Sequence, residues 1–192
     1  MKKIILTLFV ASSLLLYSIP SFAFSLSVGI PMSQTITGKQ AGKSYGNAPD
    51  KTSGYFLGVS FLSFGLGMDS YTTKFKTGNC NGCWGVGGDA GLKTNMTNIF
   101  LQLPVPVVNL IIGLGKGTTE YDCKYSFGDC SAFYDKGSAT QWYTSIGMPI
   151  IPFFDIHLSY RSVTAKNIKI KGTELKDDNS GSVTGIGLAL NF

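Results

Sequence analysis

The sequence has one histidine, few charged residues and, after its first 23 residues, no apolar run long enough for a transmembrane helix. The most apolar internal run, at 105–114, is interrupted by Pro106 and Asn109, whereas a spanning helix needs about 20 consecutive apolar residues. Only helices and closed barrels satisfy their backbone groups in lipid. If this chain crosses a membrane, we therefore expect it to do so with strands.

Several functional motifs are also missing. No glycine-rich phosphate loop precedes a helix pattern, and no nucleic-acid-binding motif is present, so we expect no cofactor and no nucleic-acid partner. The four cysteines, Cys80, Cys83, Cys123 and Cys130, include one C-x-x-C but lack a second C-x-x-C or an H-x-x-x-H. This spacing disfavours a zinc site, and we expect no bound metal.

The first 23 residues have the pattern of a signal peptide. Lys2 and Lys3 precede an apolar run at 4–16, and Ser21-Phe22-Ala23 fits the small-x-small cleavage pattern. We expect cleavage after residue 23, which leaves one domain, residues 24–192.

The end of the chain alternates with a period of two. Ile186, Leu188, Leu190 and Phe192 are apolar, and the residues between them are small or polar. This alternation predicts a strand with one apolar face, and the chain stops on an aromatic residue. A strand that closes a membrane barrel ends in this way, and the alternative is a buried strand of a soluble sandwich.

Similar alternation recurs seven times before this stretch. Three short turns, near Leu62-Ser63, at 104–107 and at 149–153, alternate with four long polar stretches that carry most of the charges. The polar stretches are residues 39–51, 74–93, 116–136 and 166–178. The expected strands are 24–30, 55–61, 64–69, 97–103, 108–117, 141–148, 154–161 and 182–192. This layout is typical of an eight-stranded barrel with its long loops on one side.

Aromatic residues fall into two bands along these strands, as the interfacial girdles of a membrane protein require. One band lies near the long-loop ends and the other near the short-turn ends. The first band is Tyr55, Trp142 and Tyr160, and the second includes Phe61, Phe64, Phe154 and Phe192.

Over residues 24–192 the chain resembles the small eight-stranded outer-membrane barrels of the OmpA transmembrane domain, OmpX and OmpW group. The resemblance is architectural, and no motif selects one member. It implies an all-β, antiparallel, up-and-down transmembrane β-barrel in a bacterial outer membrane, with periplasmic termini and extracellular long loops. It also implies a monomer that lies in the lipid bilayer and is recognised by the barrel-assembly machinery through its C-terminal strand. Lysines concentrated in the long loops suit lipopolysaccharide phosphates as point charges, so we expect lipopolysaccharide as a partner, and the alternative is that these lysines only keep the loops soluble.

Four ionisable residues are expected to face the lumen: Asp69, Asp155, His157 and Arg161. Burying them unpaired would be costly, so we expect Arg161 to pair with one or both aspartates. A structural plug is the favoured interpretation of this cluster, and a narrow polar path is the alternative.

All four cysteines fall in expected long loops, and an oxidising periplasm favours disulfides. We favour Cys80–Cys83 and Cys123–Cys130, and pairing between the two loops is the alternative.

We expect a structural or surface-interaction role without catalysis. The first alternative is a narrow channel or carrier for small or hydrophobic molecules. The second is a lipid A-modifying enzyme, because His157-Leu158-Ser159 is similar to the His-x-Ser of outer-membrane lipid A deacylases. The position of His157, near a short turn and facing inward, argues against catalysis.

Overall fold

The computed structural model describes residues 24–38, 49–75, 91–105, 107–122, 124–125, 128–171 and 177–192. The signal peptide expected at 1–23 lies outside these residues. No helix in the described part of the chain is long and apolar enough to span a membrane.

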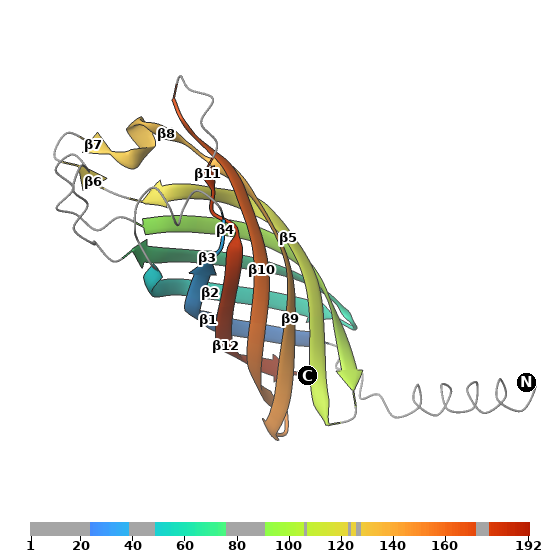
Figure 1. The fold of residues 1–192 in the computed structure, drawn as a ribbon. Helices are drawn as coiled ribbons and strands as arrows, with labels where there is room; N and C mark the ends of the chain where they lie inside the picture. The colour runs from blue at the N-terminus through green and yellow to red at the C-terminus, as the bar shows by residue number, and fades with distance from the viewer. Residues whose placement is uncertain are drawn as a thin grey trace, which may run out of the picture.

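The described residues form eight long antiparallel strands that close into a barrel (Figure 1). They are β1 (Phe24–Ile36), β2 (Pro49–Phe61), β3 (Phe64–Phe75), β4 (Gly91–Val105), β5 (Val108–Asp122), β9 (Gly137–Ile151), β10 (Phe154–Ile170) and β12 (Gly181–Asn191). Consecutive strands pair with one another, and β12 pairs with β1 to complete the circle. The expected eight-stranded up-and-down barrel is confirmed.

Short elements gather at the end of the barrel opposite the C-terminus (Figure 1). They are β6 (Lys124–Tyr125), β7 (Gly128–Asp129), the 3₁₀ helix η1 (Cys130–Ala132), β8 (Tyr134–Asp135) and β11 (Asp177–Asp178). β8 and β11 both pair with the extended part of β10.

Apolar side chains point outward and polar ones inward, as the alternation predicted. Leu66 of β3 is 61% exposed and Leu158 of β10 is 64% exposed. Three residues further along the same strands, Asp69 and Arg161 point inward and are buried. We call the outward band the apolar belt. It comprises Leu26, Val28, Leu57, Val59, Leu66, Met68, Ile99, Leu101, Ile112, Leu114, Ile146, Met148, Leu158, Ile186 and Leu188.

The two ends of the described chain meet at the short-turn end of the barrel. The Phe24 amide donates to the Phe192 carbonyl at 3.2 Å, and the Phe192 amide donates to the Phe24 carbonyl at 2.8 Å. Their rings lie 6.2 Å apart, and near the opposite edge of the belt the Trp142 and Tyr160 rings lie 5.8 Å apart. The two aromatic bands are thus separated in space, and their role as membrane girdles stays a prediction.

Several strand ends differ from those expected. β1 continues to Ile36 and β2 begins at Pro49, so both strands are longer than the expected 24–30 and 55–61. The extension is held from inside, because the buried Gln34 side chain accepts a hydrogen bond from the Thr73 hydroxyl. The turn expected at 149–153 is only Pro152-Phe153, because β9 runs on to Ile151.

The apolar belt predicts a depth-dependent response to charge. Val59→Lys should lower the unfolding free energy in lipid vesicles by about 2–4 kcal/mol, because a lysine at mid-bilayer must be desolvated. Ser53→Lys is the matched control on the same face of β2, beyond Tyr55, and should cost less than about 1 kcal/mol. Denaturant titration of the refolded protein measures both, and equal losses would contradict a lipid-facing belt.

Candidate functional site: the barrel lumen

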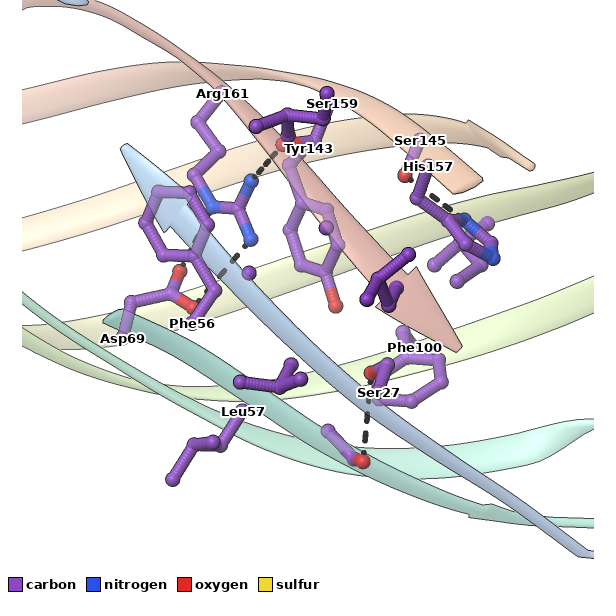
Figure 2. A pocket seen from close by; sticks show the side chains of 17 residues that line it. Ser27, Phe56, Leu57, Asp69, Phe100, Tyr143, Ser145, His157, Ser159 and Arg161 are labelled. Atoms are coloured by element: carbon purple, nitrogen blue, oxygen red, sulfur yellow. Dashed lines mark hydrogen bonds and ion pairs between the residues drawn. The ribbon is translucent and has the colours of Figure 1, made fainter. Parts of the chain in front are cut away.

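The centre of the lumen holds a buried ion pair between Asp69 of β3 and Arg161 of β10, on opposite sides of the barrel (Figure 2). The Arg161 Nε lies 3.0 Å from the Asp69 Oδ2, and the two side chains are only 6% and 1% exposed. A second guanidinium nitrogen, Nη2, lies 3.5 Å from Oδ1. The pairing expected for Arg161 is therefore confirmed for Asp69.

Aromatic rings enclose the guanidinium. Its central carbon lies 3.4 Å from the centroid of the Phe56 ring and 4.9 Å from that of Tyr143. Figure 2 shows the guanidinium group beside both rings, with the Asp69 carboxylate turned towards it. Cation–π contact strengthens when the pair is shielded from water, so the rings both fill the lumen and hold the cation.

Neutral side chains complete the hydrogen bonds of the pair. The Gln141 amide donates to Asp69 Oδ2 at 2.6 Å and to Asn98 Oδ1 at 2.7 Å. The Arg161 Nη1 donates to the Ser159 hydroxyl at 2.6 Å, and that hydroxyl donates to the Gly185 carbonyl at 3.2 Å. A buried ion pair is tolerated when its remaining donors and acceptors are satisfied in this way.

Asp155 and His157 form a second polar cluster nearer the short turns. Asp155 accepts hydrogen bonds from the side-chain amides of Asn109 and, at 2.8 Å, Asn191. The Nδ1 atom of His157 contacts the Ser145 hydroxyl at 3.2 Å. Its Nε2 lies 3.8 Å from Asp155 Oδ2, which is too long for a hydrogen bond. Arg161 does not pair with Asp155, because Asn109 and Asn191 provide the donors instead.

Apolar clusters fill the lumen on both sides of the ion pair. Phe100, Ile111 and Tyr143 pack towards the short turns. The larger cluster extends towards the long-loop end and consists of Phe56, Tyr71, Met96, Ala139, Val163, Ala165 and Val183. Glycines make room for the large rings: a Cβ on Gly65 would lie 2.1 Å from the Phe100 ring. Large side chains opposite glycines are how small barrels fill their interior.

A small cavity lies in the lumen beside the ion pair. Its volume is about 50 Å³, and Phe56, Asp69, Tyr143, His157 and Arg161 are among its lining residues (Figure 2). Since one water needs about 10–15 Å³ of such volume, the cavity has room for a few waters. The described residues contain no group of three or more His, Cys, Asp or Glu side chains placed to hold a metal ion.

Sequence reasoning found the four ionisable residues but missed their neutral partners. Gln141 binds Asp69 and Asn98, and Asn109 binds Asp155. In each case the two residues face the lumen from strands that do not pair with each other. A polar residue at an inward position is the only signal that the sequence offers for them. Which strands face each other across the lumen depends on the stagger of the barrel, which a sequence pattern does not show.

The predicted disulfides involve three cysteines outside the described residues, Cys80, Cys83 and Cys123. Cys130 is buried in η1, and no cysteine in the described ranges is free. Both the local pairings and the pairing between loops stay predictions.

The buried pair should show strong energetic coupling. Asp69→Asn and Arg161→Met should each lower the unfolding free energy by about 3–5 kcal/mol, because each leaves one buried charge without its partner. The double variant should cost less than the sum of the two, by about 1–3 kcal/mol. Lys136→Gln is a control at the same N···O distance, since the exposed Lys136–Glu120 pair also measures 3.0 Å. That change should cost less than about 1 kcal/mol, and an additive double variant would contradict direct pairing of Asp69 and Arg161.

Comparison with known proteins shows similarity in fold without similarity in sequence. No protein-family model matches the chain, and no curated protein sequence matches it significantly. The crystal structure of Neisserial surface protein A superposes with a TM-score of 0.62 at 12% identity, over 88% of this chain and 97% of that one.

Two further solved structures match over similar lengths. The solution structure of the Escherichia coli outer membrane protein W gives a TM-score of 0.53 at 14% identity, over 90% of this chain and 98% of that one. The attachment invasion locus protein Ail of Yersinia pestis, in complex with the heparin analogue sucrose octasulfate, gives 0.53 at 18% identity, over 88% and 96%. This chain therefore has the closed eight-stranded fold of small outer-membrane barrels.

Proposed function

We propose that this protein is an integral outer-membrane barrel with a structural or surface-interaction role and without catalysis. The observation that carries the proposal is the apolar belt: large apolar side chains point away from the barrel and polar ones point into it. In water such a surface would be an aggregation hazard, whereas in a bilayer it is the expected arrangement. The similarity in fold to three outer-membrane proteins supports the same location.

A ring of lysines borders the belt at the long-loop end. Five strands carry a charged residue on their outward face. On each of them, the outward charged residue nearest to the short turns is a lysine. The ring consists of Lys51, Lys74, Lys93, Lys116 and Lys166. An ammonium group suits a phosphate as a point charge, and lipopolysaccharide displays phosphates at the edge of the outer leaflet. We therefore orient this end towards the cell surface and the chain ends towards the periplasm.

Polyanion binding at this end is also consistent with one similar structure. Ail was crystallised with sucrose octasulfate, a highly charged polyanion. Four of the five lysines occupy outward positions on the neighbouring strands β2 to β5, and Lys51 lies directly opposite Lys74 in the register of β2 and β3. Lipopolysaccharide is the anionic partner that we favour.

The filled lumen disfavours the channel alternative. The ion pair, its aromatic neighbours and the two apolar clusters leave a cavity of only about 50 Å³ beside the pair. A solute path would require several buried side chains to move together and would break the hydrogen bonds of Asp69 and Arg161. We therefore assign these residues to structural plugging.

The lipid A deacylase alternative is also disfavoured. His157 and Ser159 are both buried inside the barrel, away from lipid. The Ser159 hydroxyl is bonded to Arg161 and Gly185, while His157 contacts Ser145 instead. His157 has Ser145 on its Nδ1 side and Asp155 on its Nε2 side, but the distance from Nε2 to Asp155 Oδ2 is too long for a hydrogen bond. The cavity beside these residues is also too small for an acyl chain.

The closing strand suits recognition during assembly. β12 ends at Asn191, one residue before Phe192, and pairs with β1 on one side and β10 on the other. We propose that the barrel-assembly machinery binds this strand, and that one chain forms the complete barrel as a monomer.

Binding of lipopolysaccharide should stabilise the protein through the lysine ring. Adding lipopolysaccharide to phosphatidylcholine vesicles should raise the unfolding free energy of the parent. In the double variant Lys51→Gln/Lys93→Gln this increase should be smaller, by about 1 kcal/mol for each lysine replaced. Salt should weaken the effect, since exposed charges are screened. Denaturant unfolding with and without lipopolysaccharide measures this increase.

Lys171→Gln is the matched control, because Lys171 is exposed but lies beyond the ring and donates to the Ser131 carbonyl. It should keep the full increase. An equal loss in Lys171→Gln, or no increase in the parent, would refute lipopolysaccharide binding at the ring.

A further inference from the structure

Three hairpin turns at the short-turn end each expose a large apolar side chain. Leu62 lies between β2 and β3, Val107 precedes β5, and Phe153 lies between β9 and β10. They are 55%, 84% and 60% exposed. Turns that face water usually carry glycine, asparagine, aspartate or serine at such positions. We call these three residues the turn tips.

All three turn tips have a positive φ, of 57° at Leu62, 84° at Val107 and 74° at Phe153. This left-handed region favours glycine and costs roughly 1–3 kcal/mol for other residues, with the β-branched Val107 as the most unusual occupant. Glycine or asparagine would avoid the cost. The exposed side chains recover little of it from contacts within the protein, so an external apolar contact is the physical reason to keep them.

The turn tips continue the apolar belt without a charged boundary. No residue at 52–68, 94–115 or 137–154 is charged, and each stretch includes one of the tips. The outward side chains next to the tips are also large and apolar, as Phe61, Phe64 and Ile151 show. In these three hairpins, therefore, no charged side chain marks the point where the barrel leaves the lipid.

The height of the belt also requires the turn tips. From Tyr55 to Phe61 a strand tilted by about 40° rises only about 15 Å, against an apolar band of about 25 Å in outer-membrane barrels. By the same geometry the rise is about 28 Å from Lys51 to Leu62, about 23 Å from Lys116 to Val107 and about 33 Å from Lys166 to Phe153. These rises approach or exceed the height of the band, whereas the distance between the aromatic bands falls well short of it.

We propose that the short-turn end of the barrel is embedded in the membrane, with Leu62, Val107 and Phe153 in contact with the lipids of the leaflet on that side. This inference rests on the proposed membrane location and adds how deep the barrel lies. The lysine ring fixes the opposite end at the other membrane surface. The turns act as apolar anchors in the lipid where polar turns would lie in water.

Site-directed spin labelling tests the depth of the turn tips. Leu62→Cys, Val107→Cys and Phe153→Cys are refolded in phosphatidylcholine vesicles, labelled with a nitroxide, and compared for collision with oxygen, which concentrates in lipid, and with a water-soluble nickel chelate. Val59→Cys is the reference in the belt, and Ser138→Cys is the reference in water. The parent, taken through the same labelling, gives the background from its own cysteines, and heat-modifiable gel migration confirms that each variant is folded.

The turn tips should give an oxygen-to-nickel ratio near that of Val59 and severalfold above that of Ser138. A water-like ratio at the tips together with a lipid-like ratio at Val59 would overturn this inference and leave the proposed function intact. A water-like ratio at Val59 itself would overturn both. Tips that become accessible to nickel when the protein is diluted in lipid would show that a second copy covers them, which would also overturn the inference.

Discussion

The structure depends on the pairing of its first and last strands. β1 and β12 are joined along a ladder from Ser25–Asn191 to Ile36–Gly181, so the eight long strands described leave no open edge. In lipid every unpaired backbone group would cost several kcal/mol, and closure removes that cost. Closure with only eight strands also fixes a narrow lumen. The outward apolar belt and the packed interior are both consequences of this one constraint.

The narrow lumen explains why charge is buried at the centre of the protein. Polar residues that alternate with outward-facing apolar ones point inward, where the narrow lumen holds little water to solvate them. Asp69 and Arg161 neutralise each other across the lumen, and the Phe56 and Tyr143 rings lie against the guanidinium. Asp155 instead relies on the amides of Asn109 and Asn191. The interior thus holds a polar centre between two apolar clusters, and the outer surface of the belt is apolar.

Much of the fold was predictable because each strand has two different environments. The period of two gave the eight strands, their inward and outward faces and the turn at Leu62-Ser63, where Phe61 pairs with Phe64. The pattern was less informative beyond the belt, where outward residues also become polar, and the strand end at Ile36 was therefore misjudged. The contact of Asp155 with Asn109 was not predictable, because β5 does not pair with β10 and contacts between non-adjacent strands are set by the stagger of the barrel. The apolar turn tips were missed as a feature, because their positive φ is visible only in the structure.

The central claim is that the lumen is filled and closed, and single-channel recording tests it most directly. The refolded protein, shown to be folded by heat-modifiable migration, is incorporated into a planar bilayer and recorded alongside Arg161→Ala. We predict a flat trace without discrete openings for the parent, because the ion pair and the apolar clusters block the path on both sides of the small cavity. Reproducible unitary openings of the parent, changed in size or frequency by Arg161→Ala, would contradict the account and make the lumen a regulated path.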